Sequence, residues 1–244
     1  MNPEFSIIIP AYNESNRIVK SLDKIREYFK NKKTRYEVIV VNDGSRDDTL
    51  KVLRGLLKKY SQLRVLGDNI NRGKGYAVKT GVLNSKGKYV LFTDADLSTP
   101  IGELDNLFRC IKEGYDIAVG SRNIDTSKVK VKQPFYRRFL GNALRVYYNV
   151  IIFQKKPPTD SQCGFKLFTR RAADLLFGKQ KIYREMFDIE ILYLAMKYGL
   201  KVKEVPVIWV NDPDSKINLA KCIIFGSVDL FKIRLYDLLG KYKY

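Results

Sequence analysis

The chain has 244 residues, of which 45% are hydrophobic, so it can bury a core as one large domain or two small ones and is not disordered. Its 45 Lys and Arg residues against 26 Asp and Glu give a formal net charge of +19, which calls for a polyanionic partner: nucleic acid, an anionic lipid surface or a phosphorylated substrate. Histidine is absent, which excludes histidine triads, histidine general bases and histidine-ligated zinc.

The first 120 residues alternate between strand-like and helix-like segments. Such alternation predicts an α/β fold with a mostly parallel sheet covered by helices on both faces. With no internal repeat or linker, we expect one catalytic domain over residues 1–215. The expected strands are 5–9, 36–41, 63–66, 88–93 and 117–120, and the expected helices are 13–29, 49–60, 74–84 and 101–112.

The second half is more basic. Residues 126–159 contain eight Lys or Arg and no acid, and the helix-like stretch 135–153 within them is rich in aromatic residues. We expect strands at 164–169 and 205–210 with a helix at 187–198 between them. The tail over 216–244 is expected to form an amphipathic helix with basic and apolar faces. Residues 123–160 and this tail suit an anionic membrane surface, although both helices could instead pack on the sheet.

Cysteines and targeting signals indicate the compartment. Cys110, Cys163 and Cys222 are widely separated, match no zinc spacing and suit a reducing compartment. The apolar segment before Pro10 is too short for a signal peptide. No run of 18 uncharged apolar residues occurs, so we expect no membrane-spanning helix and a cytosolic or peripheral protein.

The most informative segment is 88–100, in which an apolar run ends in two carboxylates, Asp94 and Asp96. On an extended backbone these side chains point the same way, so the two acids repel each other unless a cation lies between them. Ligands of open α/β sheets bind at the carboxyl ends of the strands, where one or two carboxylates and substrate phosphates can hold a divalent ion. The pair therefore predicts a metal–phosphate site, with a capped turn as the alternative.

Polar residues also follow the first two expected strands. Tyr12 could offer an aromatic face, and Glu14 and Asp43 could accept hydrogen bonds from a base or ribose. Each residue alone fits a capped turn, but at matching strand ends they predict a nucleotide pocket. Lys74 follows Gly73 at the start of an expected helix, where free N–H groups and the ammonium could meet phosphate oxygens.

Four segments in this order resemble the inverting glycosyltransferases of the GT-A fold in glycosyltransferase family 2. They are Ile9-Pro-Ala-Tyr-Asn-Glu14, Val41-Asn-Asp-Gly-Ser45, Asn71-Arg-Gly-Lys-Gly75 and Thr93-Asp-Ala-Asp96. Three further segments resemble the dolichyl-phosphate β-glucosyltransferase branch of that family: Gly120-Ser-Arg122, Asp160-Ser-Gln-Cys-Gly-Phe-Lys-Leu-Phe168 and Phe187-Asp-Ile-Glu190. The resemblance covers roughly residues 5–240 and implies the GT-A fold.

The resemblance also implies roles for individual residues. The donor nucleotide would be held by Pro10, Ala11, Tyr12, Glu14, Asp43, Asp94 and Ala95, and a divalent metal, Mg²⁺ or Mn²⁺, by Asp94, Asp96 and Ser98. Catalysis would depend on Asp96, Lys74, Lys216 and Arg122, and the acceptor phosphate would bind Arg122, Arg137 and Arg138. Ser98 stands where mannosyl relatives carry an amide, and Val210 where they carry an arginine. The departure at Val210 favours the glucosyl branch.

The implied reaction transfers glucose from UDP-glucose to dolichyl or another polyprenyl phosphate, with inversion, by a peripheral protein on the cytoplasmic face of a membrane. A phosphate acceptor is already ionised near neutral pH and needs no general base. Two enzymatic alternatives stay open: a dolichyl-phosphate mannose synthase, and a family 2 transferase acting on a polysaccharide or glycolipid, in which Asp188 would be the base. Nucleic acid is not an expected partner because no reading motif is present.

Overall fold

The computed structural model describes residues 2–124, 128–129, 152–153, 158–210 and 219–243. Its centre is a seven-stranded sheet in the order β3-β2-β1-β4-β7-β5-β8, and a two-stranded parallel sheet pairs β6 with β9. The strands are β1 Phe5–Ala11, β2 Tyr36–Asp43, β3 Leu63–Asp68, β4 Tyr89–Thr93, β5 Ile117–Ser121, β6 Lys128–Val129, β7 Phe165–Thr169, β8 Val202–Pro206 and β9 Ile208–Trp209.

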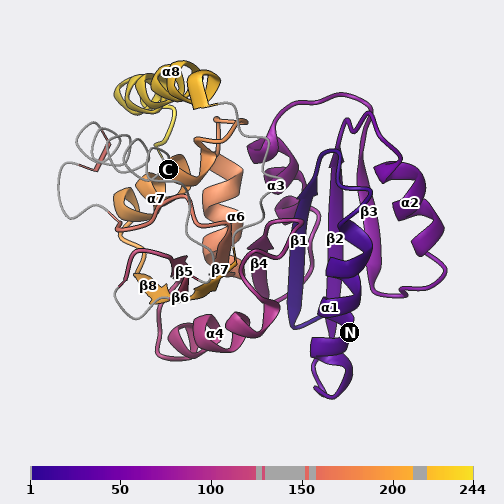
Figure 1. Cartoon of the computed structure of the whole chain (residues 1–244). Helices are drawn as coiled ribbons and strands as arrows, with labels where there is room; N and C mark the ends of the chain where they lie inside the picture. Colours follow the sequence, from indigo (N-terminus) through magenta and orange to yellow (C-terminus); the bar gives the residue numbers. More distant parts are fainter. Residues whose placement is uncertain (1, 125–127, 130–151, 154–157, 211–218, 244) are drawn as a thin grey trace.

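Helices connect these strands and cover the large sheet (Figure 1). A one-turn 3₁₀ helix, η1 Ile101–Glu103, precedes α4. The α-helices are α1 Ile18–Lys30, α2 Thr49–Leu56, α3 Lys74–Leu83, α4 Leu104–Lys112, α6 Arg170–Lys179, α7 Phe187–Lys197 and α8 Leu219–Leu238. The predicted α/β class with a mostly parallel sheet is confirmed.

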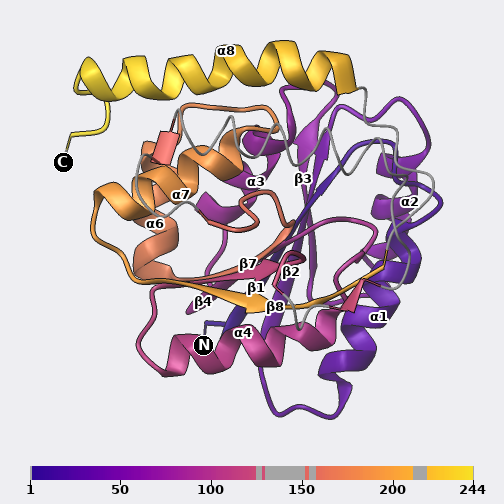
Figure 2. The same ribbon diagram turned by 60° about the vertical axis from the view of Figure 1, so that its left-hand side comes forward.

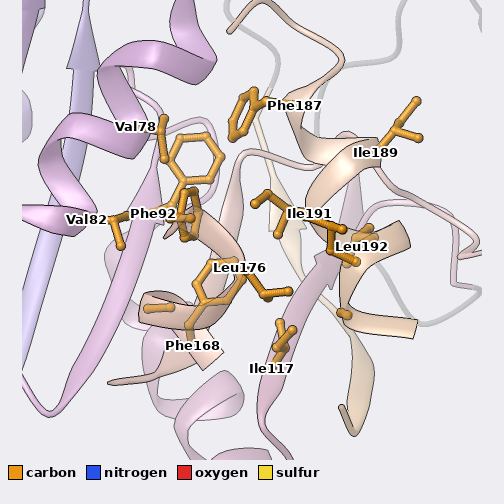
Figure 3. Close-up of a cluster of buried hydrophobic side chains, with 14 of the residues drawn as sticks. Val78, Val82, Phe92, Ile117, Phe168, Leu176, Phe187, Ile189, Ile191 and Leu192 are labelled. Atoms are coloured by element: carbon orange, nitrogen blue, oxygen red, sulfur yellow. The ribbon is translucent and has the colours of Figure 1, made fainter. Parts of the chain in front are cut away.

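Side chains alternate between the two faces of the sheet and form two cores, as the period of a strand requires. One core holds Ile7 and Ile9 of β1 against α1, α2 and α4. The other holds Ile8 of β1 with α3, α6 and α7. In this second core the rings of Phe92 and Phe187 meet edge to face with centroids 5.6 Å apart, which joins β4 to α7 (Figure 3).

The C-terminal helix α8 lies over α7, along the top of the molecule in Figure 2. Leu230 and Ile233 of its inner side belong to the second core, and Asp237 binds Lys197 of α7 at 2.6 Å. The chain end is fixed by Tyr242, which is buried and donates its hydroxyl to Glu190. Within the described part of the chain, no helix is long and apolar enough to cross a membrane.

The structure differs from the predicted elements in four places. β7 runs antiparallel to both of its neighbours, β4 and β5, and α6 was not predicted. The helix expected from residue 13 begins only at Ile18, because Asn13 has a φ of +57° and the N–H groups of residues 17 and 18 bond back to Glu14. The strand expected at 205–210 is divided between β8 and β9. Most of the expected helix 135–153 lies outside the described residues.

Candidate active site

The carboxyl ends of β1, β2 and β4 lie together, because β1 pairs in parallel with both β2 and β4. The predicted convergence of polar strand ends is therefore confirmed. β1 is longer than expected, so Pro10 and Ala11 lie within it, paired with Val41 and Asn42 of β2. The Ala11 methyl is buried in the core, so a donor nucleotide could contact this residue through its backbone.

The segment after β1 is tied to the segment after β2. Tyr12 is exposed at this edge, as a residue offering an aromatic face to a ligand would be. The N–H of Asn13 donates to Ser45 at 3.0 Å, and the N–H of Glu14 donates to Thr49 at 2.8 Å. The Glu14 carboxylate accepts two hydrogen bonds from the Arg17 guanidinium, at 2.8 and 3.0 Å.

The carboxylate of Asp43 holds the loop that leads into α3 in place by hydrogen bonds. One oxygen of its carboxylate accepts the N–H of Arg72 at 2.8 Å, and the other accepts the N–H of Gly73 at 2.9 Å. Gly73 belongs to the turn whose free N–H groups were expected to meet phosphate oxygens, and its own N–H is bound to Asp43 in this structure. Gly73 has a φ of +106°, and a Cβ there would lie 2.5 Å from the Tyr183 carbonyl oxygen, so the loop requires glycine.

Asp94 and Asp96 lie in a tight turn and not on extended backbone, because β4 ends at Thr93. The N–H of Leu97 donates to the Asp94 carbonyl at 3.2 Å, and Leu97 has a φ of +50°. The carboxylates are nevertheless close enough to interact: burial and the charge of Asp94 raise the pKa of Asp96. Ser98 donates its N–H to Asp96 at 2.8 Å, so its backbone shapes this turn.

Lys74 supplies the cation next to this pair. Its Nζ lies 2.7 Å from Asp94 Oδ1 across the gap between α3 and β4. Burial alone would lower the pKa of Lys74, but the charge of Asp94 and of two further acids outweighs burial and raises it. The ammonium therefore stays charged.

Gly164 allows Asp94 to take this position. A Cβ at residue 164 would lie 1.9 Å from Asp94 Oδ2, and the Gly164 carbonyl accepts the N–H of Asp94 at 3.2 Å. The motif 160–168 therefore helps to form the acidic site from a distant part of the sequence. This role of Gly164 was missed, although the residue stands within a segment that carried the family resemblance.

Arg122 forms a bidentate ion pair with Asp160. Its Nε and Nη2 lie 2.7 and 2.8 Å from the two carboxylate oxygens, and its guanidinium lies 5.5 Å from the Trp209 ring centroid. Burial would raise the pKa of Asp160, but the hydrogen bond and charge of Arg122 lower it below its ordinary value. A phosphate at Arg122 would therefore have to share this cation with Asp160.

Asp188 pairs with Lys166. Lys166 Nζ lies 2.5 Å from Asp188 Oδ1 and also donates to the Cys163 carbonyl at 2.7 Å. Both side chains are almost fully buried. Burial raises the pKa of Asp188 despite the opposing charges of Lys166 and Lys74. The pair joins motif 160–168 to α7 beneath the site.

Glu185 is a further acid of the site that sequence reasoning missed. It precedes α7, and although its side chain keeps contact with solvent, the loss of part of its hydration raises its pKa; the charge of Lys74 lowers the pKa and that of Asp94 raises it. Its position beside Asp188 was the only sequence signal. Three predicted site residues, Lys216, Arg137 and Arg138, lie outside the described residues.

Asp94 and Asp96 are the residues that could hold a divalent ion. Within the described part of the chain, no group of three or more acidic, cysteine or histidine side chains forms a complete metal shell. Two neighbouring carboxylates suit Mg²⁺ or Mn²⁺ when substrate phosphates and water supply the other ligands. Burial first, and then the charge of Asp94, raises the pKa of Asp96, and a divalent ion would favour its charged form.

Solved structures share the fold of this chain at low sequence identity. A mannosyltransferase from Pyrobaculum calidifontis, in complex with GDP-mannose and Mn²⁺, is 22% identical with a TM-score of 0.60, covering 96% of this chain and 65% of that one. Glucosyl-3-phosphoglycerate synthase from Mycobacterium tuberculosis, with Mn²⁺, UDP and phosphoglyceric acid, is 17% identical with a TM-score of 0.66, covering 99% and 79%. The chain thus has the GT-A glycosyltransferase fold.

Relatives found by sequence are more similar to this chain than these solved structures are. Dolichyl-phosphate beta-glucosyltransferase of Dictyostelium discoideum is 37% identical over 99% of this chain and 77% of the relative. The proteins of that name from Saccharomyces cerevisiae and Homo sapiens are 35% and 32% identical over 98% of this chain, covering 76% and 78% of their own lengths. The model of glycosyl transferase family 2 matches residues 6–177. The chain therefore belongs to glycosyl transferase family 2.

Proposed function

We propose that this protein transfers glucose from UDP-glucose to dolichyl or another polyprenyl phosphate, with inversion at the anomeric carbon. The observation that carries the proposal is the similarity to the dolichyl-phosphate beta-glucosyltransferases, which extends along nearly the whole chain at 32–39% identity. The acidic turn with Lys74 at the carboxyl edge of the sheet supports it, because that arrangement suits a nucleotide diphosphate. The named relatives favour this reaction over mannosyl transfer.

The donor diphosphate would lie between the acidic turn and α3. Asp94 and Asp96 would hold Mg²⁺ or Mn²⁺, which supplies charge neutralisation to the diphosphate as it leaves. The solved complexes of two structural neighbours contain Mn²⁺. Lys74 Nζ lies 2.7 Å from Asp94 Oδ1 and would add a positive charge beside the diphosphate. Lys216 remains a predicted second cation.

The reaction requires no proton transfer in the protein. An oxygen of the ionised acceptor phosphate attacks the anomeric carbon, the bond from that carbon to the UDP oxygen breaks, and UDP leaves with the electron pair. The residues therefore have to align the two substrates and stabilise the leaving group. The burial of Asp188 against Lys166 agrees with this view, because a base for a sugar hydroxyl would need to reach the acceptor.

An apolar row on α8 supports peripheral binding to a membrane. Val228, Phe231, Leu235 and Leu238 recur at helical spacing on its outer side, and Phe231 and Leu238 are 67% and 81% exposed. The helix was expected to have basic and apolar faces, and α8 presents these apolar side chains to solvent while other apolar residues pack inward. Lys232, near this row, and the net charge of +19 would favour an anionic surface. The cytoplasmic leaflet is the proposed location.

The proposal can be tested with a panel of labelled nucleotide sugars. The purified protein is incubated with dolichyl phosphate in vesicles, Mg²⁺ or Mn²⁺, and each of UDP-glucose, UDP-galactose, UDP-GlcNAc and GDP-mannose. We expect label in the lipid extract from UDP-glucose and little from the others. Label from GDP-mannose alone would establish the mannosyl alternative, and no lipid label from any donor would reject a polyprenyl phosphate acceptor.

A further inference from the structure

Glu190 is a buried acid of α7 that the proposed reaction does not use. It ends the segment 187–190, which carries part of the family resemblance, and its side chain is fully buried. Its carboxylate accepts the N–H of Lys181 and the N–H of Ile182, both at 2.8 Å, and the hydroxyl of Tyr242. A buried carboxylate is costly unless donors surround it, and these three groups supply the donors. Glu190 therefore joins the segment before α7 to the chain that follows α8.

The segment before α7 is also bonded to the first turn of α3. The N–H of Tyr76 donates to the Tyr183 carbonyl at 3.0 Å. The side-chain amide of Gln180, which is fully buried, donates to the Gly75 carbonyl at 2.9 Å. Gly75 and Tyr76 directly follow Lys74, so the position of this segment fixes the backbone that carries the lysine.

Lys74 is the residue of this turn that reaches the acidic site. Its Nζ lies 2.7 Å from Asp94 Oδ1, and in the proposed reaction it adds a positive charge beside the diphosphate. A displacement of about 1 Å in a group that stabilises the leaving group is enough to lower the rate of such a reaction. The contacts that hold the first turn of α3 therefore bear on catalysis.

Tyr242 is itself held firmly by its neighbours. Its ring is fully buried and meets the ring of Tyr236 edge to face, with centroids 6.3 Å apart. Its carbonyl accepts the hydroxyl of Tyr198, which follows α7, at 2.8 Å. The next carbonyl, of Lys243, accepts Lys179 Nζ of α6 at 2.8 Å. The phenol hydroxyl is therefore presented to the buried carboxylate in one position.

We propose that Tyr242 is a positioning residue: through Glu190 and the segment 180–183 it places Lys74 beside the donor diphosphate. The inference rests on the proposed function, because it takes the donor to carry a diphosphate at this edge of the sheet. Tyr242 touches no substrate and acts only through the residues that it holds.

The first measurement is hydrogen–deuterium exchange of the protein without ligands. Tyr242→Phe removes the hydroxyl and keeps the buried ring. We expect the two amides bonded to Glu190 and the amide of Tyr76 to exchange at least about tenfold faster. Tyr193→Phe is the matched control, because it removes a hydroxyl that joins α7 to Asp237 of α8 at 2.5 Å, outside this series of contacts. The same amides should exchange at the wild-type rate in the control.

The second measurement is the affinity for UDP, by calorimetry with Mn²⁺. If Tyr242 acts through Lys74, its hydroxyl matters only while the lysine is present. We expect Tyr242→Phe to weaken UDP binding about fivefold in the wild type, and less than about twofold when Lys74→Ala is already present. A variant that only weakened the fold would lose the same factor in both backgrounds.

Gln180→Leu interrupts the same contacts from the other end. The Oε1 of Gln180 accepts no hydrogen bond from a described residue, so leucine, of similar size, removes the donor and leaves no acceptor unpaired. We expect the same Lys74-dependent loss of UDP affinity as in Tyr242→Phe. This second variant decides the question if Tyr242→Phe does not fold.

Unchanged exchange in Tyr242→Phe would overturn the proposal, and so would equal losses of UDP affinity with and without Lys74. Unchanged UDP affinity in both Tyr242→Phe and Gln180→Leu would overturn it and leave the proposed function intact. A wild type that does not bind UDP would reject the proposed donor and, with it, this role of Lys74. The exchange rates would then still show whether Tyr242 holds the first turn of α3.

Discussion

At the scale of single residues, the ion pair of Arg122 and Asp160 shows how a site residue can also stabilise the fold. Asp160 is buried, and its carboxylate also accepts the backbone N–H of Arg122 at 2.9 Å. Replacing it by Asn would leave the guanidinium without its charged partner. We expect Asp160→Asn to lower the free energy of unfolding by about 2–4 kcal/mol at pH 7.

The difference in the free energy of unfolding between the wild type and Asp160→Asn should become smaller at low pH. The pKa of Asp160 is lower in the folded protein than its ordinary value. Its contribution to stability is therefore complete above the unfolded value, near 3.9, and is lost as the pH falls through the lower folded value. Urea unfolding at pH 7, 5 and 3.5 should show the wild type and Asp160→Asn equally far apart at pH 7 and 5, and closer at pH 3.5. A difference that already shrinks between pH 7 and 5 would contradict this account.

Gly164 gives a second prediction at this scale. A methyl group at residue 164 would overlap Asp94 Oδ2, so Gly164→Ala should displace the carboxylate and weaken Mn²⁺ binding by tenfold or more while the protein stays folded. Electron paramagnetic resonance can measure free Mn²⁺ during the titration. The control is Gly178→Ala in α6, because no heavy atom lies within 4 Å of its added Cβ. Unchanged Mn²⁺ affinity in Gly164→Ala would show that Asp94 does not bind the ion.

The sequence was informative about which polar residues lie together at the sheet edge and less so about their partners. Asp94 and Asp96 follow an apolar strand, and that pattern alone indicated a site at the sheet edge. Asp43 and Asp188 could not be assigned in the same way, because their partners, Gly73 and Lys166, are brought to them by tertiary packing. Local sequence carries no signal for such contacts.

At the scale of elements, α8 is the helix to which we assign the proposed membrane binding. Replacing Phe231 and Leu238 together by Ser would remove two exposed apolar side chains of its outer row, each worth about 1.5 kcal/mol or more when buried in lipid. We expect the double variant to bind vesicles of anionic phospholipid about a hundredfold more weakly, with an unchanged melting temperature.

Vesicle sedimentation measures this change, and Leu57→Ser is the matched control, since Leu57 is a half-exposed apolar residue that follows α2. Binding of the wild type should also weaken as salt is added, because part of the attraction is electrostatic. Equal vesicle binding by the wild type and the double variant would assign membrane contact to another part of the chain.

Elements with a strong periodic pattern were predicted well, and elements set by distant pairing were not. The strands up to Ser121 and the helices between them were found within a few residues, because buried β-branched runs and helical spacing identify them. The antiparallel direction of β7 was not predicted. The direction of β7 depends on how residues 165–169 insert between β4 and β5. The residues of the strand itself do not determine it.

At the scale of the whole molecule, a group of acids lies at one edge of the sheet in a protein of high net positive charge. Asp43, Asp94, Asp96, Glu185 and Asp188 gather at one edge of the sheet or beside it, although the chain as a whole carries a charge of +19. This acidic centre in a basic protein suits a metal–diphosphate complex, while the surrounding positive charge suits an anionic lipid acceptor. Of these two features, the composition alone indicated only the positive charge and not the acidic centre.

The central claim is that the protein transfers glucose from UDP-glucose to a lipid phosphate. Asp94 and Asp96 of the acidic turn, together with Lys74, would hold the donor diphosphate. The most direct measurement is the organic-extractable label formed from UDP-[¹⁴C]glucose and polyprenyl phosphate by the wild type, by Asp94→Asn and by the control Glu113→Gln, in which an exposed acid at the end of α4 is replaced. We predict labelled lipid from the wild type and the control, its loss when EDTA is added, and at least a hundredfold lower rate for Asp94→Asn. Labelled lipid formed equally well by Asp94→Asn would contradict the account.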